Sequence, residues 1–173
     1  MQINDSRVIA MPYSGSPQTI ALMCKAALES QRHFAVRKYA ESICSQLDSK
    51  DYISEYLAMY HAVLRDTRYM RDPLTIELVK APYRVAEQIL AGGRPSLDCD
   101  DSATFLAALC LAVGGKVEFA TVAFEKMPQQ QYSHVFTRVQ DQRTGRWIVL
   151  DPVAAERTPT MLRDIKAMKV WAV

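Results

Sequence analysis

The sequence of 173 residues lacks a strong excess of charge of either sign. Its 21 basic and 19 acidic residues give a formal net charge of +2, without the basic surplus that a nucleic-acid backbone attracts. It also lacks an apolar run of membrane-spanning length and, at its start, a basic segment followed by an apolar one. We therefore expect no nucleic-acid partner, no membrane association and a cytoplasmic location.

Cysteine is scarce, with four residues, and no two of them have the short spacing of a zinc site. Cys24, Cys44 and Cys110 lie among apolar residues at helical spacing, where a free thiol behaves as a small hydrophobic group. We expect these thiols to remain reduced in a cytoplasm rather than to pair in disulfides. No segment is typical of cofactor binding, so the sequence predicts neither a cofactor nor a metal ion.

Helical patterns fill the first two thirds of the sequence, and strand patterns fill the last third. Apolar residues recur at helical spacing in four regions, the first of which is one long helix or two: 17–48, 51–64, 82–91 and 98–113. Strands are predicted at 117–124, 134–139, 146–150 and 170–173. Helices followed by consecutive strands imply an α+β fold, with an antiparallel sheet against a central helix.

Cys99 differs from the other cysteines because it opens the most apolar of these helices, between Asp98 and the pair Asp100-Asp101. Unpaired amides and the helix dipole favour a negative charge there, which suits a nucleophilic thiolate. Three aspartates argue against burial but also raise a thiol's pKa. We expect two of them to cap the helix and one to be solvated, in preference to a calcium or magnesium site.

The predicted hairpin brings a histidine and an aspartate together. If its loop is 141–144, Gln140 pairs with Gly145, and stepping outwards pairs His134 directly with Asp151. Directly opposed Cβ atoms lie about 4.5 to 5.5 Å apart, close enough for an imidazole to donate a hydrogen bond to a carboxylate. A thiol nucleophile needs such a base, and the base needs a partner that fixes its tautomer.

Three motifs together resemble the transglutaminase-like superfamily, within the papain-like cysteine hydrolases. They are Asp98-Cys99-Asp100-Asp101 opening an apolar helix, His134-Val135-Phe136 opening a strand, and Trp147-Ile148-Val149-Leu150-Asp151-Pro152 closing a hairpin. The resemblance implies Cys99 as the nucleophile, His134 as general base and acid, and Asp151 as the orienting carboxylate. It also implies a papain-like α+β fold with the nucleophile helix packed on an antiparallel sheet. We expect one domain over 1–173, with a helical N-terminal part over 1–66 and a catalytic core over 67–155.

The resemblance implies acyl transfer on a protein or peptide substrate by a cysteine protease, an amidase or a transglutaminase-like enzyme. The small size is similar to the compact microbial and phage-encoded members. A second hypothesis is therefore a phage morphogenesis or virion component with a vestigial or single-use triad, located in the host cytoplasm or the virion. Its interaction surface would be a helix face with Tyr52, Tyr56 and Tyr60. Acetyl transfer from a thioester cofactor ranks third, for want of a cofactor-binding segment.

Overall fold

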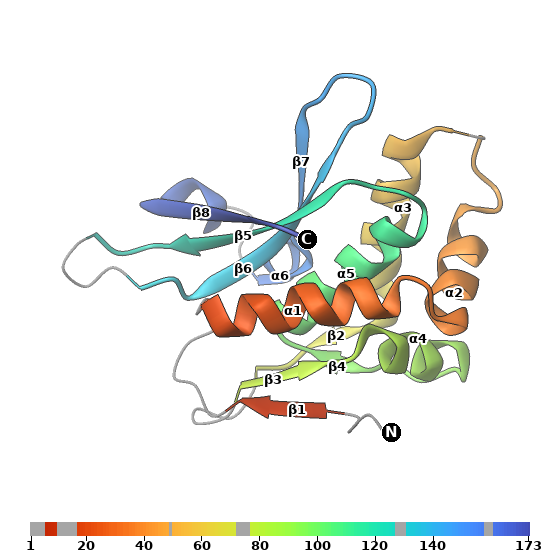
Figure 1. The fold of residues 1–173 in the computed structure, drawn as a ribbon, viewed down its shortest axis with the longest axis horizontal. Coiled ribbons are helices and arrows are strands. Elements are labelled where there is room, and N and C mark those ends of the chain that lie inside the picture. The colour runs from red at the N-terminus through yellow and green to blue at the C-terminus, as the bar shows by residue number, and fades with distance from the viewer. Residues whose placement is uncertain (1–5, 10–16, 49, 72–76, 127–130, 158–160) are drawn as a thin grey trace.

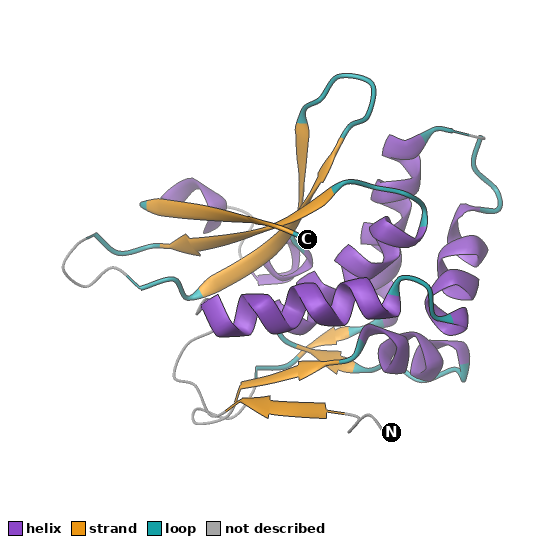
Figure 2. Cartoon of the chain, viewed as in Figure 1, coloured by secondary structure: helices purple, strands orange, loops and turns teal. Residues whose placement is uncertain are grey.

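A computed structural model describes residues 6–9, 17–48, 50–71, 77–126, 131–157 and 161–173. Helices and a four-stranded antiparallel sheet lie on opposite sides of one central helix (Figures 1 and 2). The predicted α+β class is thereby confirmed. Within the described part of the chain, no helix has both the length and the apolar character needed to cross a membrane.

Four helices surround the central one. They are α1 (Pro17–Ser30), α2 (Phe34–Cys44), α3 (Tyr52–Asp66) and α4 (Pro82–Leu90). The region 17–48 forms two helices rather than one, because His33 interrupts it and caps α2 by accepting the N–H of Ala35 at 3.3 Å. Asp51 caps α3 in the same way, through the N–H of Ser54 at 3.3 Å.

The central helix is α5 (Cys99–Ala112), which packs against all four of these helices and against the large sheet. Every residue from Asp100 to Cys110 is buried, as the nearly uniform apolar pattern predicts. The helix ends at two glycines. A Cβ at Gly115 would lie 2.8 Å from the Cys110 carbonyl oxygen, so only glycine fits where the chain turns towards the sheet.

The large sheet has the strand order β7-β6-β5-β8, with every neighbouring pair antiparallel. Its strands are β5 (Val117–Ala123), β6 (His134–Gln140), β7 (Trp147–Leu150) and β8 (Ala167–Ala172). Val135 and Val139 of β6 join the apolar core around α5, whereas Phe136 joins a second, smaller cluster. Because strand side chains alternate, these clusters lie on opposite faces of the sheet.

Two small sheets complete the helical side. The strands β1 (Ser6–Ile9) and β3 (Glu77–Lys80) pair antiparallel, while β2 (Arg68–Tyr69) and β4 (Ser96–Leu97) pair parallel. Between β7 and β8 lie α6 (Pro152–Arg157) and a 3₁₀ helix, η1 (Met161–Asp164). The sequence patterns anticipated neither β2, β4, α6 nor η1, since elements this short carry no periodicity.

The hairpin between β6 and β7 has a longer loop than predicted. Gln140 pairs with Trp147 rather than with Gly145, so six residues separate the paired ends instead of four. Asp141 organises this loop: its carbonyl accepts the N–H of Gly145 at 2.8 Å and its carboxylate accepts the N–H of Arg143 at 2.9 Å. Gly145 adopts a φ of 74°, a left-handed conformation that favours glycine. The hydrogen bonds within this loop therefore shift the pairing of β6 with β7 by two residues.

This shift changes how His134 and Asp151 meet. The prediction that they are directly opposed is wrong, because the last pair of the ladder is Thr137 with Leu150 and β7 ends there. A shift of two residues is even, however, and therefore leaves each side chain on its predicted face. The two residues approach each other diagonally, just beyond the end of β7.

Candidate active site

Cys99 is the first residue of α5, and Asp98 is its N-cap. The Asp98 carboxylate accepts the N–H of Asp101 at 3.1 Å, and its carbonyl accepts the N–H of Ser102 at 3.1 Å. The first of these bonds satisfies one of the amides that every helix start leaves unpaired, and the second is the first backbone bond of the helix itself. Cys99 itself is half-buried, in contrast to the fully buried Cys110. The structure therefore places this thiol at a capped helix start.

The three aspartates around Cys99 are all buried, with exposures of 5% for Asp98, 0% for Asp100 and 1% for Asp101. The expectation that two cap the helix and one is solvated is thus wrong: Asp98 is the cap, and Asp101 turns to Lys80 at the end of β3. Asp101 accepts the backbone N–H of Lys80 at 2.6 Å and forms an ion pair with its ammonium. The Asp101 carboxylate can be buried because Lys80, from a strand distant in the sequence, supplies the opposite charge.

Opposing influences act on the Asp101 carboxyl. Burial raises its pKa to about 7, the neighbouring Asp98 adds to this effect, and the Lys80 ammonium opposes it.

Among the described residues, no group of three His, Cys, Asp or Glu side chains is arranged to hold a metal ion.

The imidazole of His134 and the carboxylate of Asp151 form a buried hydrogen bond of 2.7 Å between Nε2 and Oδ2. The other carboxylate oxygen accepts the N–H groups of Val153 at 3.1 Å and Ala154 at 3.0 Å, in the first turn of α6. A carboxylate can only accept, so Nε2 carries the proton of this bond. Asp151 thereby fixes the ring orientation and leaves Nδ1 as the nitrogen that can act as a base.

The helix α5 and the strand β6 begin at the same end of the sheet. The Thr137 hydroxyl donates to the Ala103 carbonyl of α5 at 2.7 Å, so the two elements lie side by side one turn beyond Cys99. At the far end, α5 leads into β5, whose first residue pairs with Val139 near the end of β6. Cys99 and His134 consequently both lie at the opposite end, where β7 stops and α6 packs against α5.

Replacing Thr137 by valine should lower the free energy of unfolding by about 1 kcal/mol, because it removes one buried hydrogen bond at nearly constant volume. Urea denaturation monitored by circular dichroism measures this change. Since Thr137 joins α5 to β6, we also expect slower modification of Cys99 by thiol reagents. Unchanged stability would show that this bond does not hold the helix on the sheet.

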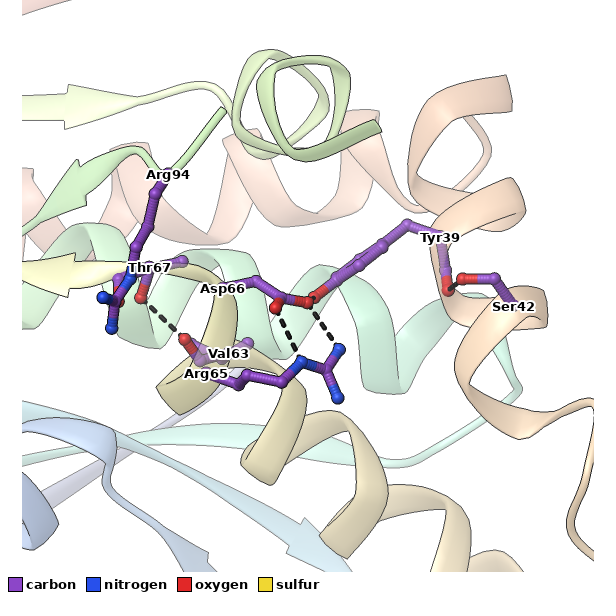
Figure 3. Close-up of polar contacts among 7 residues, drawn as sticks. All are labelled: Tyr39, Ser42, Val63, Arg65, Asp66, Thr67 and Arg94. Atoms are coloured by element: carbon purple, nitrogen blue, oxygen red, sulfur yellow. Dashed lines mark hydrogen bonds and ion pairs between the residues drawn. The ribbon is translucent and has the colours of Figure 1, made fainter. Parts of the chain in front are cut away.

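A polar network supports the strand that leads into Cys99 (Figure 3). The Arg94 guanidinium donates to the Thr67 carbonyl at 3.0 Å, which joins the segment before β4 to the segment before β2. Nearby, Asp66 accepts the Tyr39 hydroxyl at 2.7 Å and both Nε and Nη2 of Arg65. The Arg65 bonds are the largest cause of the lowered pKa of Asp66. This network ties α2 and α3 to the small parallel sheet.

The other three thiols are unfavourably placed for reaction, and no disulfide involves any of the four cysteines. Burial raises the pKa of Cys24, of Cys44 to about 11, and of the fully buried Cys110. At pH 7 these thiols are therefore protonated and weakly nucleophilic. The sequence pattern likewise places these three cysteines, unlike Cys99, among apolar helical residues.

Iodoacetamide at pH 7 should modify Cys99 at least about tenfold faster than Cys24, Cys44 or Cys110, because only a thiolate reacts readily. Peptide mass spectrometry over a time course measures the four rates in one sample. Comparable rates at Cys99 and Cys44 would contradict the expected selectivity.

Of the three tyrosines predicted to form an interaction surface, one is buried and two are partly exposed. Tyr56 is fully buried, and Tyr52 and Tyr60 pack against the apolar core. Tyr60 also donates its hydroxyl to the backbone carbonyl of Asp151 at 3.5 Å. Sequence reasoning missed this contact with the candidate site, because nothing in the sequence indicates that α3 lies beside the end of β7.

No known family model matches the chain, and no curated protein is significantly similar to it. Solved structures that share its fold include the following two. A "putative cysteine protease" from Cytophaga hutchinsonii aligns with a TM-score of 0.53 and 15% identity, over 97% of this chain and 58% of its own. A "putative protease" from Parabacteroides distasonis aligns with a TM-score of 0.54 and 13% identity, over 76% of this chain and 25% of its own. The likeness is one of fold, consistent with a papain-like α+β architecture, and the chain matches less than two thirds of either protein's length.

Proposed function

We propose that this protein is a cysteine-dependent acyl-transfer enzyme, acting as a peptide or amide hydrolase or as a transglutaminase-like enzyme. Cys99 is the nucleophile, His134 the general base and acid, and Asp151 the residue that orients the imidazole. The observation that carries the proposal is the buried bond between His134 Nε2 and Asp151 Oδ2, at the end of the sheet where α5 begins with Cys99. The two similar structures, named "putative protease" and "putative cysteine protease", add support at the level of fold.

The proposed reaction has two halves. In the first, His134 Nδ1 takes the Cys99 proton, the sulfur bonds to the substrate carbonyl carbon, and the carbon–nitrogen bond breaks as the leaving amine receives that proton. The backbone N–H of Cys99, at the helix start, is the proposed oxyanion donor. In the second half, water or an amine attacks the thioester and the thiol is released.

The nature of the second nucleophile distinguishes a hydrolase from a cross-linking enzyme. Casein and glutamine-containing peptides should be incubated with the protein, with and without a fluorescent primary amine, and the products measured by mass spectrometry. New carboxyl termini or deamidated glutamine would identify hydrolysis, and incorporated amine would identify transfer. Products that form equally with Cys99→Ala would overturn the proposal.

A further inference from the structure

Lys80 is linked to the proposed nucleophile through a short chain of buried and partly buried contacts. It is the last residue of β3, and it holds Asp101 by both its backbone N–H and its ammonium. The N–H of Asp101 in turn donates to the carboxylate of Asp98, the residue directly before Cys99. The Asp101 side chain is fully buried, and that of Lys80 is 30% exposed. A strand far from Cys99 in the sequence therefore holds the first turn of α5.

The charges in this turn oppose the reactivity that the helix start provides. The helix dipole favours a thiolate at Cys99, but the buried carboxyl groups of Asp98, Asp100 and Asp101 disfavour a further negative charge. Charge interactions in a buried turn are screened far less than those on the surface. The Lys80 ammonium is a positive charge bonded directly to this acidic group.

We propose that Lys80 is a positioning residue of the candidate site, which fixes the first turn of α5 through Asp101 and balances the acidic residues around Cys99. This inference rests on the proposed role of Cys99 as the nucleophile. Lys80 acts on the thiol through Asp101 and through its electric field, without a part in bond making.

Other charged groups also lie at this end of α5. His134 of β6 is held by its hydrogen bond to Asp151. Arg71 follows Met70, which extends β2 and donates its N–H to the Leu97 carbonyl of β4. Arg71 is exposed, so solvent and salt weaken its effect. His134, Asp151 and Arg71 are unchanged in every variant of the test, so their influence on the thiol is constant across the comparison.

The test is the rate of iodoacetamide reaction at Cys99 between pH 5 and 10, measured for the wild type, Lys80→Gln, Lys80→Arg and Asp101→Asn. Loss of the positive charge in Lys80→Gln should move the midpoint of the pH profile upwards and slow labelling at pH 7 by about three- to tenfold. Loss of the negative charge in Asp101→Asn should move the midpoint downwards. Lys80→Arg should keep the wild-type profile.

The opposite direction of the two shifts separates an electrostatic role from simple damage to packing. If Lys80→Gln and Asp101→Asn move the midpoint in the same direction, or leave it unchanged while lowering the melting temperature, the inference is overturned. Should Asp101→Asn fail to fold, the contrast between Lys80→Arg and Lys80→Gln decides, and equal profiles overturn the inference. Lys25→Gln is the matched control, since Lys25 forms an exposed ion pair with Glu29 within α1.

Failure of this inference is distinct from failure of the proposed function. A wild-type protein whose Cys99 reacts and whose substrates turn over, but whose profile ignores Lys80, would overturn the role of Lys80 alone. A wild-type protein without any Cys99-dependent product would overturn the proposed function, whatever the labelling profile of its thiol.

Discussion

Replacing Cys99 by alanine should abolish the proposed acyl transfer, with a loss in kcat/KM of at least about 10³-fold, because it removes the sulfur that we propose as the nucleophile. No other thiol can substitute. Burial raises the pKa of the other three, and Cys110 lies fully inside the core. Residual turnover would be limited to what the oxyanion donor and substrate binding supply.

The fold should survive this change, since Cys99 is half-buried and alanine is a good helix former. We expect the free energy of unfolding to change by less than about 1 kcal/mol. Cys24→Ala is the matched control, because Cys24 is a half-buried thiol on α1 whose Sγ contacts the Ala172 carbonyl, at 3.7 Å, in β8. Equal activity loss in both variants would indicate a general effect of removing cysteine rather than a nucleophile at position 99.

Replacing Asp151 by asparagine should lower kcat by about 10²- to 10⁴-fold while leaving the fold intact. The two carboxylate oxygens have separate tasks: Oδ2 accepts from His134, and Oδ1 accepts from Val153 and Ala154. Asparagine has one acceptor oxygen. We expect this oxygen to accept the two N–H groups of α6 rather than the single imidazole N–H. The asparagine NH₂ then faces Nε2, which drives the imidazole proton to Nδ1 and removes the base.

Steady-state kinetics and thermal unfolding of the same preparation test this expectation. Asp141→Asn is the control, because it makes the same substitution in the same hairpin, where Asp141 organises the loop. It should lower stability slightly and leave kcat near that of the wild type. An Asp151→Asn enzyme with normal kcat would show that the buried bond to His134 does not serve the reaction.

Most of the helices and strands follow from the sequence because their signals are local. The apolar repeat and the capping residue Asp51 define α3, and the nearly uniform apolar run with two terminal glycines defines α5. The α+β order of elements follows from the same patterns. By contrast, β2, β4 and α6 are too short for a periodic signal, and neighbouring elements determine them.

The hairpin illustrates how a wrong register can preserve a correct face. The sequence predicts a four-residue loop, and the Asp141 turn produces a six-residue one. Because side chains alternate with a period of two, the even shift leaves His134 and Asp151 on the same face. Their contact at 2.7 Å is therefore diagonal rather than direct.

The helix that begins at Cys99 and the shared face of His134 and Asp151 can be predicted from local sequence, because capping and strand alternation act over a few residues. The burial of the aspartates around Cys99 depends instead on tertiary contacts. Burying a carboxyl group requires a partner, and for Asp101 that partner is Lys80, 21 residues earlier in the chain. No local pattern encodes such a pairing, since it exists only once β3 and α5 have packed together.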